Sequence, residues 1–434
     1  MRASGHSSGW PRWHFSDSSS SWRCSMSPTR FVSPDAPPES SPARDGAIMR
    51  HPTPGDGPHR SRTVPAEPAP PASPVADARL QSTGLLPPPL GTPIAVAYRS
   101  IIAHRNRAFD RRERVTQLSV PVISVGNLSV GGTGKTPMVM ELVRWLRDSG
   151  HTPVVSMRGY RPAGLGSEQS SDEYAEYRLQ FPDLPVVVSA DRASALRDYL
   201  SKPNVAPGTV VVLDDGFQHR FVARDLDMVL IDALRDPLRD RCLPAGWLRE
   251  PVQSLGRAGA IVLTRTDLVD PSCAARLESS LRNFARPETV FAHARHAWSS
   301  LDVHIGEAAT GESTAWLARR PVVVACAIGN PHAFIAQVRA AGATIIRTII
   351  RRDHHAWKPR DMDQLASLVR AEPVDGVVTT CKDWVKLSGV PRRPASIPFI
   401  VPRVRIEFTR GLPQLREAVL KAAVGHGPAE ARRA

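Results

Sequence analysis

Cysteine is scarce in this chain of 434 residues, and its few copies form no recognisable pattern. The five cysteines, at positions 24, 242, 273, 326 and 381, contain no CxxC pair and no even-numbered framework. The pattern argues against a disulfide scaffold or a structural zinc site and is typical of a reducing cytoplasm.

Long apolar runs are also missing. No window of about 18 uninterrupted apolar residues occurs, which argues against a transmembrane helix. The first residues, MRASGHSSGWPRWHF, lack the apolar segment of a secretory signal. We therefore expect the folded part of the chain to face the cytoplasm.

Positive charge, by contrast, is in excess. Lysine and arginine number 56 against 42 acidic residues, which gives a formal net charge of +14. Such an excess indicates an anionic partner, which is nucleic acid, an acidic lipid surface or a phosphorylated substrate. Charge alone does not choose among these three.

Proline is concentrated near the start of the chain, where 18 of the 41 prolines fall within the first 93 residues. A segment this polar and proline-rich buries too little apolar surface to offset chain entropy, so residues 1–92 are predicted to be a disordered extension. A start codon assigned too early, with Met49 as an internal start, is the alternative. Residues 427–434 are expected to be a tail.

The ordered part is predicted to begin near Pro93 with a basic amphipathic helix. Ile94, Ala97, Tyr98, Ile101 and Ile102 recur at helical spacing. The basic residues around and after them are Arg99, His104, Arg105, Arg107, Arg111, Arg112 and Arg114. Such a helix either lies on an anionic membrane surface or packs on the core with a solvated basic flank.

Residues 93–302 show the alternation of a doubly wound parallel sheet. A β-branched run at 119–125 leads through a glycine-rich turn into a helix at 135–149, which Gly150 ends. Further strands are predicted at 153–157, 185–189, 210–213, 228–232 and 260–264, some separated by helical stretches such as 191–200.

A second series of strands and helices begins near Arg320. Strands are predicted at 321–328, 343–350, 376–380 and 398–408, and helices at 332–341, 360–371 and 411–424. Residues 320–426 are therefore expected to form a smaller α/β domain, joined through a polar linker at 303–319.

The glycine-rich turn matches a phosphate-binding loop, and its position between a strand and a helix is the context that this motif requires. Backbone N–H groups would cradle phosphate oxygens, Lys135 would reach the β and γ phosphates, and Thr136 would hold Mg²⁺. The consensus expects glycine at 129, where this chain has serine. The predicted fold is thus a P-loop NTPase-like domain with a second, smaller α/β domain. The predicted nucleotide-binding residues are Ser129, Val130, Gly131, Gly132, Thr133, Gly134, Lys135 and Thr136.

A pair of carboxylates follows the apolar run at 210–213. Asp214 and Asp215 stand where a buried strand ends, which is the position of a Walker B acid that orients magnesium opposite the P-loop. Both are predicted Mg²⁺ residues.

Several further motifs occur in a fixed order along the chain. They are VPVISVGNLSVGGTGKTP at 120–137, SMRGYRP at 156–162, Ser171-Asp172-Glu173, DDGFQHR at 214–220, RDLDMVLIDA at 224–233, LPAGWLREP at 243–251, IGNP at 328–331, Asp353-His354-His355 and TTCKDWVKL at 379–387. From roughly residue 94 to 410 the chain resembles the tetraacyldisaccharide 4'-kinases, the lipid A 4'-kinase family.

The resemblance implies transfer of the ATP γ-phosphate, with Mg²⁺, to the 4'-hydroxyl of an acylated glucosamine disaccharide 1-phosphate. It further implies peripheral attachment to the anionic cytoplasmic face of the bacterial inner membrane, with the nucleotide between a larger and a smaller domain. No nucleic acid partner is expected.

The resemblance also implies roles for particular residues. Asp172 matches the carboxylate that takes the proton from the attacking hydroxyl, and Glu173 is its acidic neighbour, assigned to the metal site. His354, or alternatively His355, would pair with Asp172. Arg249 would neutralise charge on the phosphoryl group, or else form a structural ion pair with Glu250 or another carboxylate. Two positions depart from the family pattern, Ser171 in place of glycine and Trp247 in place of proline.

Two rival functions compete with the kinase. The turn Thr264-Arg265-Thr266-Asp267 faintly resembles a guanine-reading motif, which would suit a P-loop GTPase or a nucleotide-driven metallochaperone. The arginine cluster at 105–114 would suit a nucleic-acid-binding protein, although Phe109 is its only aromatic residue and no recognition motif accompanies it.

Overall fold

The structure, a computed structural model, describes residues 86, 88–111, 115–159, 172–353, 355–391, 393 and 395–425. The predicted extension at 1–92 and tail at 427–434 lie almost wholly outside these residues. Helix α1 (Pro88–Asp110) begins before Pro93, the residue at which order was expected to start.

The described residues form one twelve-stranded sheet in the order β10-β9-β11-β12-β7-β6-β5-β1-β4-β2-β3, with β8 paired to β7. The strands from β7 to β3 in this order pair in parallel, as do those from β10 to β12. The antiparallel pair β7 and β12 joins the two parallel parts. The predicted α/β fold with a mostly parallel sheet is confirmed.

The part of the sheet that contains β1 has these elements in chain order: β1 (Val122–Asn127), α2 (Lys135–Asp148), β2 (Thr152–Met157), α3 (Asp172–Gln180), β3 (Val186–Val188), α4 (Arg192–Leu200), β4 (Thr209–Asp214), β5 (Leu226–Asp232), η1 (Val252–Arg257), β6 (Ala260–Thr264), η2 (Thr266–Leu268) and α5 (Pro271–Arg282). Each strand predicted from the sequence in this region is present.

The remaining elements are β7 (Val290–Ile305), β8 (Ala308–Glu312), η3 (Thr314–Leu317), β9 (Pro321–Cys326), α6 (Pro331–Ala340), β10 (Thr344–Ile350), α7 (Pro359–Ala371), β11 (Gly376–Thr379), α8 (Cys381–Leu387), β12 (Phe399–Arg410) and α9 (Leu412–Val424). The range 303–319, expected to be a linker, holds the end of β7 together with β8 and η3. The division of the chain into domains stays a prediction.

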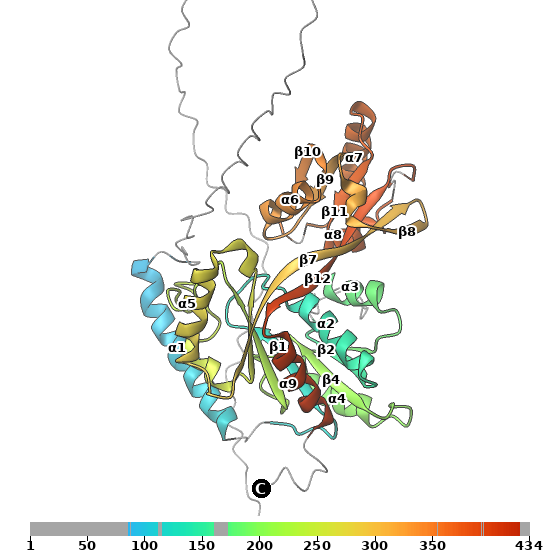
Figure 1. Cartoon of the computed structure of the whole chain (residues 1–434). Helices are drawn as coiled ribbons and strands as arrows, with labels where there is room; N and C mark the ends of the chain where they lie inside the picture. Colours follow the sequence, from blue (N-terminus) through green and yellow to red (C-terminus); the bar gives the residue numbers. More distant parts are fainter. Residues whose placement is uncertain are drawn as a thin grey trace, which may run out of the picture. The chain divides into compact units, whose positions relative to one another are not determined.

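Apolar side chains alternate between the two faces of the central strands, as burial on both faces requires. On β5, Met228 and Leu230 join a core with α2 and α9, whereas Val229 and Ile231 join a second core with α5 and η1. Figure 1 shows α2 and α9 on one side of this sheet and α1 and α5 on the other. Helix α9, last in the chain, therefore packs beside the helix that follows the glycine-rich turn.

Strand β1 lies between β4 and β5. The chain runs from β1 to β2 and β3 on one side of β1, and later crosses from β4 to β5 on its other side. In open parallel sheets, ligands bind at the carboxyl ends of the strands where the strand order reverses. The glycine-rich turn follows β1, Asp214 ends β4 and Asp215 comes directly after it, so the fold brings both predicted motifs to this position.

Candidate active site

The glycine-rich turn has the backbone that a phosphate-binding loop needs. Gly131 and Gly134 have φ values of 119° and 91°, in the left-handed region that favours glycine, and Gly134 is the N-cap of α2. Ser129, where the consensus has glycine, forms an isolated β-bridge with Leu248 and has no positive φ. The serine at this position therefore costs no backbone strain.

Lys135 and Arg249 converge on the carboxylate of Asp215. Lys135 Nζ lies 3.5 Å from Asp215 Oδ1, and Arg249 Nη1 lies 2.9 Å from Asp215 Oδ2. Burial raises the pKa of Asp215, but Lys135 and then Arg249 outweigh it and leave the pKa below its ordinary value. The carboxylate is thus held ionised between two cations at the mouth of the loop.

Asp214 lies in a different environment, although it is the neighbouring residue. Its side chain is buried, and its Oδ2 accepts a hydrogen bond of 2.8 Å from the Tyr177 hydroxyl. Burial raises the pKa of Asp214, while Tyr177 and Lys135 oppose that rise. The buried Arg192 donates a bond of 2.7 Å to the Asp214 carbonyl and fixes the end of β4.

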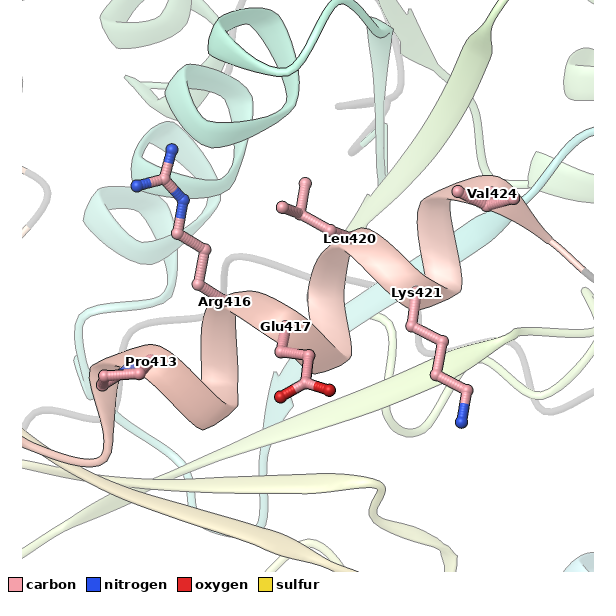
Figure 2. Close-up of a pocket in the computed structure, with 6 residues that line it drawn as sticks. All are labelled: Pro413, Arg416, Glu417, Leu420, Lys421 and Val424. Carbon is pink, nitrogen blue, oxygen red and sulfur yellow. The ribbon is translucent and has the colours of Figure 1, made fainter.

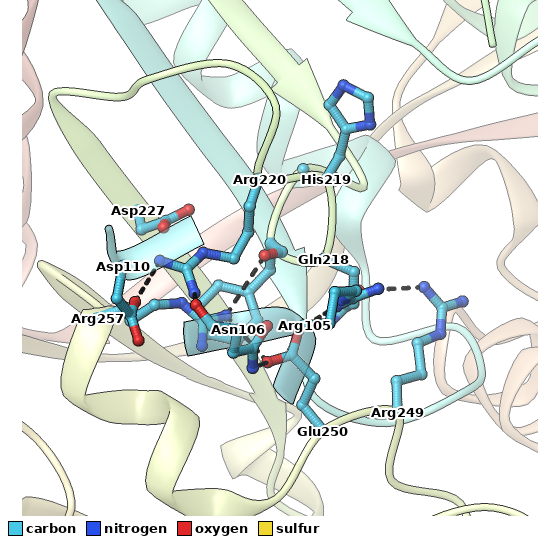
Figure 3. Close-up of polar contacts among 12 residues, drawn as sticks. Arg105, Asn106, Asp110, Gln218, His219, Arg220, Asp227, Arg249, Glu250 and Arg257 are labelled. Atoms are coloured by element: carbon cyan, nitrogen blue, oxygen red, sulfur yellow. Dashed lines mark hydrogen bonds and ion pairs between the residues drawn. The ribbon is translucent and has the colours of Figure 1, made fainter. Parts of the chain in front are cut away.

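Arg249 does not pair with Glu250. Its ion pair is with Asp215, which is the other possibility that the sequence left open, a carboxylate other than Glu250. Glu250 is fully buried and accepts bonds of 3.0 Å from Asn106 of α1 and from Arg257. The Tyr98 hydroxyl, also on α1, donates to the Arg249 carbonyl at 2.9 Å. Figure 3 shows Glu250 beside Asn106 and Arg105, with Arg249 pointing away toward Gln218. Helix α1 therefore anchors the backbone from which Arg249 reaches Asp215.

Asp172 is the first residue of α3 and Glu173 is the second. The side chain of Asp172 is not among the described parts of the structure. Glu173 is partly exposed. Helix α3 packs against α8, which belongs to the C-terminal part of the chain. One helix thus carries Asp172, Glu173 and Tyr177, the residue that holds Asp214.

His354 lies outside the described residues, but both of its neighbours are described. Lys382 of α8 binds Asp353 at 3.0 Å, and His355 Nε2 lies 3.1 Å from Asp361 Oδ2. His355, the alternative partner for Asp172, is therefore engaged with an acid of its own part of the chain.

Asp383, a buried acid on α8, contacts the chain again at Trp357, a few residues after His354. Asp383 accepts bonds from the Trp357 indole at 3.1 Å, the Thr380 hydroxyl at 2.7 Å and the Ala327 amide at 2.9 Å. The segment around His354 is consequently fastened to α8, and α8 rests on α3.

Sequence reasoning missed Tyr177 and Arg192, which fix the two sides of Asp214. Tyr177 lies on the helix that begins with Asp172, so the helical spacing of the run DEYAEY was the available signal. Asn127 was also missed: its amide donates to Thr133 Oγ1 at 3.1 Å and to the Gly131 carbonyl at 3.4 Å. An asparagine that ends a strand before a glycine-rich turn is a recognisable sign of this role.

Two surface hollows lie away from these residues. One, of about 610 Å³, is lined only by residues of α9, and Figure 2 shows Arg416 and Leu420 on one side of that helix and Glu417 and Lys421 on the other. The second, of about 470 Å³, involves the strand-starting segments 119–121 and 208–209, at the opposite end of the strands from the glycine-rich turn. Neither hollow contains a predicted site residue.

A glycine-rich loop between strand and helix, a lysine at the helix start and acids at the end of the adjacent parallel strand define a P-loop nucleotide-binding enzyme. The sequence profile of the family described as Tetraacyldisaccharide-1-P 4'-kinase matches residues 88–423. The chain belongs to this family and is a kinase. Its reaction is the 4'-phosphorylation of a lipid A precursor, and the GTPase and metallochaperone alternative is set aside.

Individual relatives and a solved structure agree with this assignment. The tetraacyldisaccharide 4'-kinase of Syntrophobacter fumaroxidans is 36% identical over 66% of this chain and 77% of its own. That of Chlorobium luteolum is 32% identical over 76% of this chain and 96% of its own. A crystal structure of LpxK from Aquifex aeolicus in complex with ATP covers 76% of this chain and 98% of its own, with 26% identity and a TM-score of 0.58.

Proposed function

We propose that this chain uses ATP bound at the loop 129–136 to phosphorylate the 4'-hydroxyl of a tetraacyldisaccharide 1-phosphate, with Asp172 as the base. The observation that carries the proposal is the convergence of Lys135 and Arg249 on Asp215 at the mouth of that loop. A helix N-terminus attracts anions, and the two cations lie beside one. A bound triphosphate can therefore replace the carboxylate of Asp215 as the partner of Lys135 and Arg249.

Lys135 and Arg249 are the proposed charge-neutralising groups. Phosphoryl transfer spreads negative charge over the transferring oxygens, so fixed cations lower its barrier. Asp215 holds both cations in place before the nucleotide binds. The backbone of Arg249 is also held in place. Tyr98 donates to its carbonyl group, and the next residue, Glu250, accepts a hydrogen bond from Asn106 of α1.

The donor set fits magnesium. Mg²⁺ prefers oxygen ligands and commonly takes one or two carboxylates, with water and phosphate oxygens as the rest. Thr136 and Asp215 offer a hydroxyl and an ionised carboxylate beside Lys135, and Asp214 and Glu173 supply further acids. We assign these four residues to the Mg²⁺ site, where the bound ion would neutralise the phosphate oxygens.

Asp172, the first residue of α3, is the proposed base. Tyr177, five positions later on α3, contacts Asp214, and that contact ties the helix to the end of β4. The segment that contains His354 is fastened through Lys382 and Asp383 to α8, which packs on α3. These contacts support a pairing of His354 with Asp172 that orients the carboxylate toward the acceptor hydroxyl.

Helix α1 is the proposed contact with the anionic cytoplasmic face of the inner membrane. Ala95, Ile102 and Phe109 of α1 are buried, whereas Ile94 and Ile101 are 50% and 66% exposed. Exposed apolar side chains interleaved with basic ones suit the boundary of an anionic bilayer. None of the helices in the described part of the chain is long and apolar enough to cross a membrane.

The reaction is tested with γ-labelled ATP, Mg²⁺ and the disaccharide 1-phosphate lipid in mixed micelles. Label is expected in the lipid with the wild type and with Lys421→Ala, a control on the exposed surface of α9, and in less than about one hundredth of that amount with Lys135→Ala. Lipid labelling by Lys135→Ala at the wild-type rate would overturn the site assignment.

Membrane contact is tested by flotation with vesicles of phosphatidylcholine alone or mixed with anionic phosphatidylglycerol. The wild type is expected to float only with the anionic vesicles, and the double variant Ile94→Gln/Ile101→Gln is expected to stay behind. Ile305→Gln is the matched control, because Ile305 is 48% exposed at the end of β7. Equal flotation of the double variant would remove α1 from the membrane contact.

A further inference from the structure

The turn that follows β6 contacts the backbone of the phosphate-binding loop. The Thr264 hydroxyl donates a hydrogen bond of 3.1 Å to the Thr133 carbonyl, and Arg265 Nη2 donates one of 2.6 Å to the Gly132 carbonyl. Arg265 Nη1 pairs with Asp232 at the end of β5. The side chain that faintly resembled part of a guanine-reading motif is therefore engaged with the loop itself.

Three consecutive carbonyl groups of the loop are held by side chains from two strand ends and one turn. Asn127, at the end of β1, donates to the Gly131 carbonyl at 3.4 Å. Arg265 and Thr264 hold the next two carbonyls, those of Gly132 and Thr133. The loop thus has a side-chain donor for each carbonyl group from 131 to 133.

Holding a carbonyl group also aims the next amide. In a trans peptide the C=O and the following N–H point in opposite directions within one plane. Donors that fix the carbonyls of residues 131 to 133 therefore direct the N–H groups of residues 132 to 134 away from those donors. An anion in the loop is bound by such N–H groups.

The backbone of Arg265 is strained, and its charge is compensated by Asp232. Its φ is 58°, in the left-handed region that a residue with a Cβ adopts only at a cost in free energy. Asp232 is largely buried, takes the guanidinium charge and also accepts a bond of 3.1 Å from the Leu234 amide. Asp232 therefore holds the Arg265 guanidinium in place against the Gly132 carbonyl.

We propose that Arg265 is a positioning residue of the kinase reaction, one that sets the orientation of the loop amides through the Gly132 carbonyl and acts together with Thr264 and Asn127. The proposal rests on the proposed function, because it takes the loop at 129–136 as the site of the nucleotide phosphates. Residues that orient the ligands of a metal site typically contribute about 10- to 100-fold to affinity or activity, and we expect an effect of similar size from Arg265.

The test compares the affinities of ATP and inorganic tripolyphosphate, the latter measured by competition with ATP. Arg265→Ala is expected to weaken both by a similar factor, on the order of tenfold, because the loss lies at the phosphates. Arg265→Lys, which keeps one donor, is expected to fall between. Arg320→Ala is the matched control: Arg320 also bridges a carbonyl, that of Trp316, and a carboxylate, that of Asp375, but lies near β9.

Two results would overturn the proposal. Unchanged affinity of Arg265→Ala for both compounds would show that the loop orients itself without this residue. Weaker ATP binding with unchanged tripolyphosphate binding would show that the turn reads the base instead. Failure of the wild type to bind ATP would count against the proposed function and is thus distinguishable.

A second variant keeps the test decisive if Arg265→Ala does not fold. Thr264→Val preserves the shape of the side chain and removes the hydroxyl, which donates to the Thr133 carbonyl at 3.1 Å and has the Ile231 carbonyl of β5 at 3.4 Å as its second partner. The structure predicts the same parallel loss for ATP and tripolyphosphate. Wild-type affinity of Thr264→Val for both compounds would contradict the inference.

Discussion

Arg249 Nη1 lies 2.9 Å from Asp215 Oδ2. The segment between β5 and η1 therefore meets the end of β4 beside the start of α2. We expect Arg249→Met to lower kcat by about 10²- to 10³-fold, because a fixed cation at the transferring phosphoryl group is lost. The KM for the lipid should change little. Steady-state kinetics with both substrates measure the two effects, and a wild-type kcat in the variant would assign Arg249 a purely structural role.

A Cβ at position 134 would overlap the ring of His296, and Gly134 has a φ of 91°. Gly134→Ala is therefore expected to lower the thermal midpoint without nucleotide by several degrees and to abolish ATP binding. Gly132→Ala is the matched substitution, since a Cβ there meets nothing within 4 Å. It should leave the midpoint unchanged in the absence of nucleotide. Equal thermal midpoints for the two variants would contradict the packing of His296 on the loop.

The Tyr177 hydroxyl donates to the buried carboxylate of Asp214. Tyr177→Phe leaves that carboxylate short of a donor and is expected to destabilise the protein by about 1–3 kcal/mol. It also removes a contact that lowers the pKa of Asp214, so that pKa rises further. The acid limb of the pH profile of kcat/KM should then move to higher pH. Tyr199→Phe, on α4, is the control; an unmoved acid limb in Tyr177→Phe would dissociate Asp214 from activity.

His296 gives the stability a defined pH dependence. Burial, with a contribution from Arg265, lowers the pKa of His296 from 6.5 to about 4. Between these two values the unfolded chain binds a proton that the folded chain does not, so this contribution is complete above pH 6.5 and is lost as the pH falls toward 4. Each such histidine makes the free energy of unfolding fall by up to about 1.4 kcal/mol per pH unit.

Denaturant unfolding at pH 7 and pH 5 measures this slope. His296→Gln is expected to lose less stability than the wild type between the two values, because one titrating group has been removed. An identical loss in both proteins would show that His296 is protonated equally in the folded and unfolded states.

The sequence was sufficient for the loop and the sheet around it, because short β-branched strands and a glycine-rich turn before an amphipathic helix are local patterns. It was not sufficient for β7. The run from His293 to Ser300 mixes histidine, arginine, tryptophan and serine, and it becomes a strand through pairing with β12, about a hundred residues later. No local pattern records such a partner.

The candidate site shows the same division. The loop residues and the two acids could be proposed from spacing, because their roles follow from the strand and helix that carry them. The partner of Arg249 could not, because Glu250 is adjacent in sequence whereas Asp215 is brought near only by the fold. Arg265 carried a misleading local resemblance, and only the folded chain connects it to Gly132.

Transfer by Asp172→Asn tests the central claim most directly. In single-turnover experiments with γ-labelled ATP and the disaccharide 1-phosphate lipid, this variant is expected to bind ATP as the wild type does. Its transfer rate should fall by at least about 10²-fold, because the attacking hydroxyl loses its base. Transfer at the wild-type rate with unchanged ATP binding would contradict the account, since a proton acceptor other than Asp172 would then serve the reaction.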